Sequence, residues 1–427
     1  MERRGFLRTA VIGGSAAALG GSLWRDAALA TPVPAPGTAP VPGTAPVPIP
    51  DPGLDDPAPD PAAGSSARPA ADGPAQPGPG PYGALGAADA NGIALPAGFA
   101  SRVIARSGQR VTGTSYSWHS APDGGACFAD GDGWIYVSNA EIDPSGGASA
   151  VRFDPSGAIT GAYRILSDTR QNCAGGQTPW NTWLSCEEVS RGWVYETDPR
   201  GVAPAVRRDA MGRFKHEAAA ADPVRRVIYL TEDESNGCFY RFVPTVWGDL
   251  SSGVLQVLTA GGATSGSFTW TTVPDPDGSP TVTRSQVPGA RKFSGGEGCY
   301  YADDRVWFTT KGDNRVWRLN LNAGTYALAY DDSLVSGDAP LTGVDNVTGS
   351  ASGDLFVAED GGNMEICVIT PEGEVAPFLR IGGQSASEIT GPAFSPDGTR
   401  LYFSSQRGTS GSSSGGITYE VTGPFRV

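Results

Sequence analysis

Carboxylates and one cysteine recur at matching positions of a pattern that the sequence repeats six times between Trp134 and Arg407. Each copy has an aromatic anchor followed by an apolar and a small residue; the anchors are Tyr136, Trp183, Tyr229, Trp307, Phe356 and Tyr402. Ten to twelve residues before the anchors stand Gly125, Cys173, Glu217, Glu297, Asn346 with its neighbour Asp345, and Gly391. Three to five residues after the anchors stand Asn139, Glu141, Glu187, Glu188, Glu232, Asp233, Lys311, Glu359, Asp360, Gln406 and Arg407.

Side chains of these types ligate metal ions. Oxygen-rich clusters suit Ca²⁺, and a thiolate recruits a softer or higher-valent ion such as iron. Each acid taken singly could be a loop cap or a surface charge, and Cys173 a small buried residue, but agreement in register across five repeats favours a site. The predicted metal ligands are Cys173, Glu217, Glu297, Asp345, Glu141, Glu188, Glu232, Asp233, Glu359 and Asp360.

The repeat also predicts the elements that position these side chains. Successive anchors are 47, 46, 78, 49 and 46 residues apart, which is one period once about thirty inserted residues are removed from the third interval. Gly-rich turns separate short β-branched and aromatic runs, as in all-β proteins. We therefore predict an all-β, six-bladed β-propeller over residues 94–427. Because neighbouring antiparallel strands reverse direction, both sets of polar residues should lie on one face of the central channel.

Two segments before residue 94 are predicted to lie outside the fold. Arg3 and Arg4 precede an apolar stretch and the small-residue site Ala28-Leu29-Ala30, which indicates a twin-arginine signal peptide over residues 1–30. Its fourteen weakly apolar residues fall short of the roughly 20 that a spanning helix needs. Residues 31–93 are rich in Pro, Ala and Gly and should form a disordered linker. We expect a protein exported to the periplasm or the extracellular space.

Composition narrows the classes of function. A net charge of −14 argues against nucleic acid as a partner. The chain has only two histidines, His119 and His216, so histidine-rich metal sites and most histidine-based triads are poorly supported. Its six cysteines permit disulfides in an exported protein but show no C-x-x-C pair, which argues against a zinc finger. His216 neighbours Glu217 on a strand, so it should point to the opposite face and act in packing.

Several blocks resemble the PhoX-type alkaline phosphatases. They are NCAGGQTPWNTWLSCEE (172–188), GRFKHEAAAADP (212–223), VIYLTED (227–233), FYRFVP (239–244), DNVT (345–348) and GPAFSPDG (391–398). The resemblance implies a six-bladed propeller, export, and a phosphomonoesterase site that holds Fe³⁺ and Ca²⁺, with a small phosphate ester as substrate. It places the iron-binding cysteine at Cys173 and metal-binding glutamates at Glu217 and Glu297. In this reading the ions act as Lewis acids and no protein nucleophile is required.

The chain departs from that pattern at Gly295. The resembling phosphatases have a phosphate-binding arginine two residues before the glutamate that matches Glu297. We rank Lys311 and Arg407 first as catalytic cations in its place, because both belong to the set that follows the anchors; Arg241, Arg291 and Lys292 are further possibilities.

Two other classes of function stay open. One is a calcium-dependent propeller hydrolase of the lactonase or phytase kind. The other is a non-catalytic exported propeller with structural ions. We expect a monomer with no membrane span after signal cleavage.

Overall fold

The computed structural model describes residues 73–426. The predicted signal peptide and most of the predicted linker lie outside these residues. Strands account for nearly all the regular structure, and the described part of the chain contains no α-helix. Short 3₁₀ turns occur at Asp209–Met211, Thr283–Ser285, Lys311–Asp313, Asp332–Leu334, Gly408–Ser410 and Ser413–Gly415. The predicted all-β, propeller-like arrangement is confirmed.

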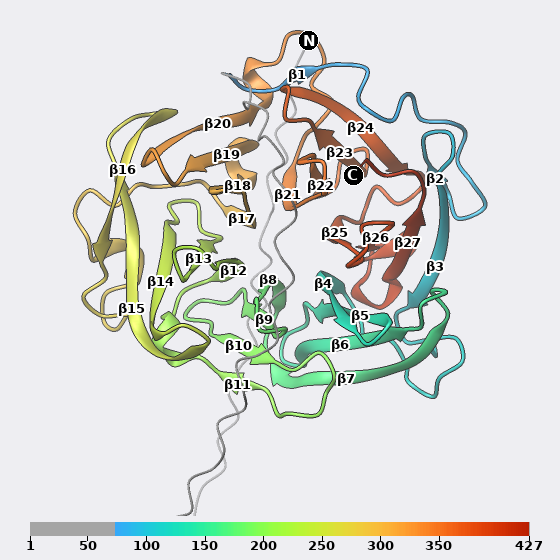
Figure 1. Ribbon diagram of the computed structural model, residues 1–427, viewed down its shortest axis with the longest axis horizontal. Coiled ribbons are helices and arrows are strands. Elements are labelled where there is room, and N and C mark those ends of the chain that lie inside the picture. The colour runs from blue at the N-terminus through green and yellow to red at the C-terminus, as the bar shows by residue number, and fades with distance from the viewer. Residues whose placement is uncertain (1–72, 427) are drawn as a thin grey trace, which may run out of the picture. The chain divides into compact units, whose positions relative to one another are not determined.

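The strands run in antiparallel units of four, and the first strand of each unit lies nearest the centre of Figure 1. These inner strands are β4 (Pro122–Asp130), β8 (Asn172–Gln177), β12 (His216–Asp222), β17 (Gly296–Ala302), β21 (Val344–Gly349) and β25 (Ile389–Phe394). The second strands are β5 (Gly133–Ala140), β9 (Trp183–Glu187), β13 (Val227–Glu232), β18 (Arg305–Thr310), β22 (Leu355–Glu359) and β26 (Arg400–Ser405). The third strands are β6 (Gly146–Phe153), β10 (Val194–Thr197), β14 (Phe239–Val246), β19 (Arg315–Asn320), β23 (Glu365–Ile369) and β27 (Ile417–Thr422). The outer strands are β7 (Ile159–Thr169), β11 (Val206–Arg207), β15 (Asp249–Ala260), β20 (Thr325–Asp331), β24 (Glu374–Ile381) and β3 (Ala100–Arg106).

The sheets number five rather than the six separate blades that the repeat predicts. The reason is β16 (Ser265–Thr272), which lies in the insertion and pairs with both β15 and β20. It thereby joins the units β12–β15 and β17–β20 into one nine-stranded sheet. The insertion adds a strand at the outer edge of these two units.

The circle closes through the N-terminal strand of the domain. β3 pairs antiparallel with β27, so the start and the end of the domain share one sheet. This closure removes a free sheet edge. Tyr82, Phe99, Phe378 and Phe425 pack together at the closure, with Phe99 and Phe425 ring centroids 5.0 Å apart.

The described residues before β3 also belong to the fold. The sequence predicts a disordered linker up to residue 93, but β1 (Gln76–Pro77) and β2 (Ile93–Ala94) both pair with β24. The composition of 73–93 resembles a linker, yet β24 offers its unpaired backbone groups to this segment, which covers the edge.

The aromatic anchors lie on the second strands and face the core between sheets. Tyr136, Tyr229, Phe356 and Tyr402 are completely buried, and Trp183 nearly so. Trp307 is half-buried. The repeated aromatic is therefore a packing residue that sets the position of the strand end that follows it.

Every inner strand has an irregularity in its pairing near its start. The register with the second strand shifts after Pro122, Asn172, His216, Gly296, Val344 and Thr390. Such β-bulges bend a strand and redirect side chains. The first two or three residues of each inner strand are therefore set apart from the rest.

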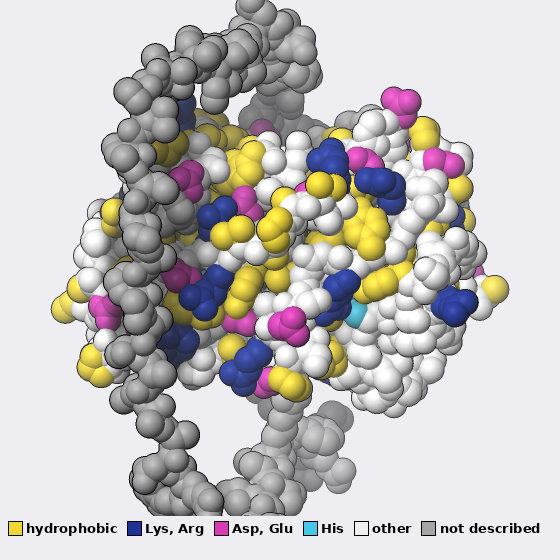
Figure 2. Space-filling view, turned by 90° about the horizontal axis from the view of Figure 1, so that it is seen from below, with side chains coloured by type: hydrophobic (Ala, Val, Ile, Leu, Met, Phe, Trp, Pro, Cys, Tyr) yellow, Lys and Arg dark blue, Asp and Glu magenta, His cyan; other side chains and the backbone are white. Residues whose placement is uncertain are grey.

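On the outside of the domain, basic and acidic side chains alternate. Figure 2 shows Lys and Arg beside Asp and Glu over the face that includes β7 and β11. Arg152 and Arg200 both pair with Asp130, and Arg207 pairs with Asp209. Exposed ion pairs of this kind contribute little to stability.

Candidate metal centre at the channel mouth

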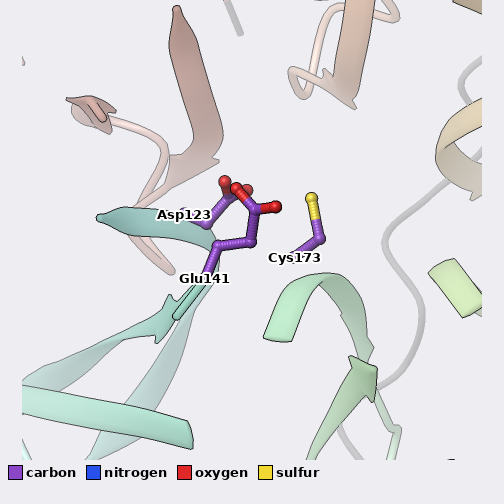
Figure 3. A group of neighbouring side chains, drawn as sticks. All are labelled: Asp123, Glu141 and Cys173. Atoms are coloured by element: carbon purple, nitrogen blue, oxygen red, sulfur yellow. The ribbon is translucent and has the colours of Figure 1, made fainter. Parts of the chain in front are cut away.

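The starts of the inner strands converge on one end of the central channel, which we call the mouth. Four overlapping triads of possible ligands surround it, and within each triad one donor atom per residue lies within 4.8 Å of the others. The triads are Asp123–Glu141–Cys173, Cys173–Glu188–Glu217, Glu217–Glu297–Asp345 and Asp345–Asp360–Glu388. Figure 3 shows the first of them, with the carboxylates of Asp123 and Glu141 close together and the Cys173 sulfur pointing to the same space. The structure thus brings most of the predicted residues into one continuous arc.

Hydrogen bonds between neighbouring units hold the backbone at the ligands. Asn139 donates its amide to the carbonyl oxygen of Cys173 at 3.1 Å, and Thr231 donates its hydroxyl to that of Glu297 at 2.5 Å. Thr309 makes the same bond to the carbonyl oxygen of Asp345. Each donor comes from the second strand of the preceding unit, so the circular fold itself fixes the spacing of the ligands.

Glu217 lies at the centre of the arc and has no compensation in the protein. Its side chain is completely buried, and neither carboxylate oxygen has a hydrogen-bond partner among residues 73–426. Burial, together with Glu297 and Glu188, holds its pKa well above the ordinary range. A buried, unpaired carboxylate is strongly unfavourable, which indicates that a cation belongs beside it.

Several other acids at the mouth also have raised pKa values. Burial and the charge of Glu141 raise the pKa of Glu188 to about 8, and burial raises that of Asp345 to about 7. Burial and the charge of Glu141 also raise the pKa of Asp123. Burial and the nearby carboxylate of Asp123 raise the pKa of the Cys173 thiol. The donor set of buried carboxylates with one thiol therefore fits hard cations beside one thiolate-binding ion.

Basic side chains compensate part of this charge. Lys311 Nζ lies 2.9 Å from Glu297 Oε1 and 3.7 Å from Asp360 Oδ2. Arg407 pairs with Glu388 at 2.8 Å, so both predicted cations reach the mouth. Gln406 donates from its amide to Asp123 and Glu141.

Two predicted ligands do not reach the mouth. Glu232 pairs with Arg284 at 2.9 Å and accepts hydrogen bonds from the Cys238 N–H and the Tyr240 hydroxyl. Glu359 accepts from the N–H groups of Thr342 and Glu365, inside the sheet. Successive residues of a strand point to opposite sides, so the acid after each of them, Asp233 or Asp360, is the one at the mouth.

Sequence reasoning missed three mouth residues. Asp123 follows the first paired residue of its inner strand, as Cys173 and Glu217 do on theirs. Gly125 lies after the bulge. Glu388 directly precedes β25. Lys215 Nζ binds Glu188 Oε1 at 2.8 Å and Asp233 Oδ2 at 2.7 Å.

Gly295 lies beside the mouth, where a side chain would meet the ligands. Its φ is +69°, and a Cβ there would lie 3.0 Å from Asp233 Oδ1 and 3.9 Å from Glu297 Oε1. A residue other than glycine would be strained in this backbone conformation and would crowd Asp233.

His216 and the cysteines other than Cys173 are packing residues. His216 is completely buried, donates from Nε2 to the Gly212 carbonyl at 3.0 Å, and packs on Phe214. Burial lowers its pKa to about 4, so it is neutral at neutral pH. All six cysteines are free thiols.

Below the mouth the channel narrows and then widens again. The neck, about 40 Å³, is lined by small residues such as Gly124, Ala174 and Gly298. A Cβ on Gly124 would lie 2.5 Å from Ala174 Cα, so glycine allows the inner strands to approach this closely. Beyond the neck a cavity of about 480 Å³, the far cavity, opens between residues such as Gln177, Tyr301 and Thr348.

The fold and the site together define a propeller-like protein with a buried, acidic candidate metal centre at one end of its channel. The family model for "Alkaline phosphatase PhoX" matches residues 137–191, 189–327 and 310–408. The chain belongs to this family, and it is accordingly an enzyme of the phosphoric monoester hydrolase class. No curated protein sequence matches the chain.

One solved structure supports the propeller-like fold. PhoX from Pseudomonas fluorescens in complex with vanadate, a transition-state analogue, matches with a TM-score of 0.65 and 18% identity over 82% of this chain and 98% of that chain. A gluconolactonase from Xanthomonas campestris matches with a TM-score of 0.45 and 13% identity over 84% and 99%, respectively. Regucalcin, a calcium-binding protein from Agrobacterium tumefaciens, gives 0.43 and 14% over 77% and 96%.

Proposed function

We propose that the chain is an exported, metal-dependent alkaline phosphatase whose active site is the mouth. The observation that carries this proposal is Glu217, a completely buried carboxylate with no partner among the described residues, placed between three further acids and Cys173. Membership of the PhoX family supplies the reaction class.

The ligand set that we propose differs from the one that the sequence predicts. It retains Cys173, Glu217, Glu297, Asp345, Glu141, Glu188, Asp233 and Asp360, adds Asp123 and Glu388, and leaves out Glu232 and Glu359. Nine carboxylates then face Lys215, Lys311 and Arg407, so several positive charges are needed for neutrality. We propose Fe³⁺ at Cys173 and Ca²⁺ among the carboxylates. When bound, these ions act as Lewis acids on the phosphoryl oxygens.

The side chains of the chain itself bind and orient the substrate. Lys311 and Arg407 place positive charge at the mouth, where they would contact the phosphate oxygens of a small ester. Gly295 has no side chain that would crowd Asp233 and Glu297. The neck, whose volume is close to that of one water molecule, prevents the substrate from passing into the far cavity.

Activity and metal content of protein exported in native form test this function together. We expect turnover of p-nitrophenyl phosphate that chelator abolishes, iron and calcium in elemental analysis, and a visible colour from thiolate-bound iron. Cys173→Ser should lose iron and colour, whereas Cys299→Ser, in the far cavity, should keep both. Active, colourless wild-type protein would rule out iron at Cys173. Turnover of a lactone without turnover of any phosphomonoester would rule out the phosphatase.

We also propose the finer features of the molecule. The halves of the nine-stranded sheet count as two blades, which gives a six-bladed propeller spanning 94–427. Export follows the twin-arginine pathway to the periplasm or beyond, and the mature protein is a monomer. Arg3→Lys with Arg4→Lys should leave the protein in the cytoplasm. Among the described residues, no helix is long and apolar enough to cross a membrane.

A further inference from the structure

The chain contains only three lysines beside 28 arginines, and two of the three lie at the mouth. Lys215 bridges Glu188 and Asp233, which follow the second strands of neighbouring units. Lys311 likewise bridges Glu297 and Asp360. Each ammonium therefore connects carboxylates from two units.

These carboxylates are also the proposed metal ligands. Glu188 shares a triad with Cys173 and Glu217. Glu297 shares one with Glu217 and Asp345, and Asp360 shares one with Asp345 and Glu388. An oxygen that binds an ammonium at 2.7 to 2.9 Å cannot direct the same lone pair at a metal ion. Lysine and metal thus compete for the same atoms.

Lysine is better suited than arginine to be a partner that a metal ion displaces. The exposed pairs on the outside of the domain use arginine, whose planar fork holds a carboxylate in a fixed geometry. Lysine is a point charge on a flexible four-carbon stem, so its ammonium can leave one site and reach another. The side chains of Lys215 and Lys311 are 29% and 35% exposed, so their ammoniums can reach water without unfolding.

We propose that Lys215 and Lys311 are resident counter-ions that hold the mouth together without metal and are displaced when cations bind, so that metal loading makes two ammoniums available to a phosphate group. This inference rests on the proposed function. Although burial alone lowers the pKa of each lysine, Glu188 raises that of Lys215 and Glu297 that of Lys311, so both remain charged.

Calcium affinity measures the competition directly. Metal-free full-length protein is titrated with Ca²⁺ alone in a calorimeter, for the wild type, Lys215→Met and Lys311→Met. Each variant should bind Ca²⁺ at least about tenfold more tightly, because the ion then neither has to displace an ammonium nor is repelled by one. Lys292→Met is the matched control, since Lys292 lies away from the mouth beside Cys238 and Arg284. Unchanged or weaker binding in both mouth variants would overturn the proposal.

Amine labelling of the wild type gives a second readout that needs no variant. In metal-free protein an acylating reagent should modify Lys215 and Lys311 more slowly than the exposed Lys292, as measured by peptide mass spectrometry. Saturating Ca²⁺ should raise labelling of the two mouth lysines several-fold and leave Lys292 unchanged. Mouth lysines that stay equally protected, or become more protected, would contradict displacement.

Phosphatase activity distinguishes failure of the counter-ion role from failure of the proposed function. Wild-type protein that binds Ca²⁺ and hydrolyses p-nitrophenyl phosphate, with unaltered affinity in both variants, refutes the counter-ion role alone. Wild-type protein that neither binds Ca²⁺ nor hydrolyses the ester refutes the proposed function as well.

Discussion

The two ends of the central channel are built from the same inner strands, but they differ sharply in chemistry. At the mouth, the second residues of five of these strands are Asp123, Cys173, Glu217, Glu297 and Asp345. A few residues further along the same strands, the described residues that line the far cavity include no Asp, Glu, Lys, Arg or His.

The repeated bulge separates the two chemistries. Before it, five of the six inner strands carry an acid or Cys173 at the mouth; after it, regular pairing resumes and small residues such as Gly125, Gly175 and Ala219 follow. Because bulges re-aim side chains, one irregularity repeated around a circle is sufficient to concentrate ligands at one end. The position of the bulge, rather than the propeller as such, therefore defines the site.

The largest expected effect of a single change is at Glu217. Glu217→Gln keeps the shape and removes the charge, so phosphatase kcat/KM and metal affinity should both fall by more than about a hundredfold, since side chains that only support a metal ligand already change affinity or activity by about 10- to 100-fold. The same variant without metal should melt at a higher temperature than metal-free wild type, because a buried unpaired charge is gone. Activity assays, elemental analysis and thermal melting check both signs. Lower stability of the metal-free variant would show that Glu217 has a partner in the protein.

The sequence predicts many of the residues that line the mouth and part of the fold around them. The anchors correctly mark the second strands, and counting back from them finds Cys173, Glu217, Glu297 and Asp345. The same count misses Asp123, because β4 is longer than the other inner strands. Asp123 therefore lies 13 residues before Tyr136, outside the window of ten to twelve.

The remaining errors have physical reasons of two kinds. Glu232 and Glu359 look like their neighbours Asp233 and Asp360 in sequence, and the alternation of side chains along a strand could have separated them. The pairing of β16 with β20 and the order of 73–93 depend on which sheet edges are free, a long-range property that local patterns do not encode. Lys215 precedes its strand and belongs to no repeated position.

The next largest effect is the pH dependence of the metal-free protein. Burial raises the pKa of Asp345 to about 7 and of Glu188 to about 8, above their values in an unfolded chain. Groups with a raised folded pKa contribute stability at low pH that is lost as pH rises through that pKa. The melting temperature of metal-free protein should therefore fall by several degrees between about pH 5 and pH 8. Saturating Ca²⁺ should flatten this trend, and a melting temperature that rises with pH in the metal-free protein would contradict the assignment of uncompensated charge to the mouth.

A smaller effect is expected at the rim of the mouth. Arg407→Met removes the guanidinium that pairs with Glu388, so KM for p-nitrophenyl phosphate should rise about tenfold, which corresponds to about 1.4 kcal/mol. Arg407→Lys should recover part of the loss, because the charge is restored without the fork. Steady-state kinetics with both variants check this, and a loss in kcat with KM unchanged would show that Arg407 acts on the reaction rather than on binding.

The smallest effects should come from the far cavity, although its residues share strands with the ligands. Thr348 lies three residues after Asp345 on β21, and Gln177 four residues after Cys173 on β8. Thr348→Val and Gln177→Leu should change phosphatase kcat/KM and Ca²⁺ affinity by less than about twofold, as substitutions away from charged networks usually do. Kinetics and calorimetry on the folded variants test this. A tenfold loss of turnover in either variant would mean that a change in the far cavity alters the mouth through the neck. The channel would then work as one site, and the bulge would divide its chemistry but not its function.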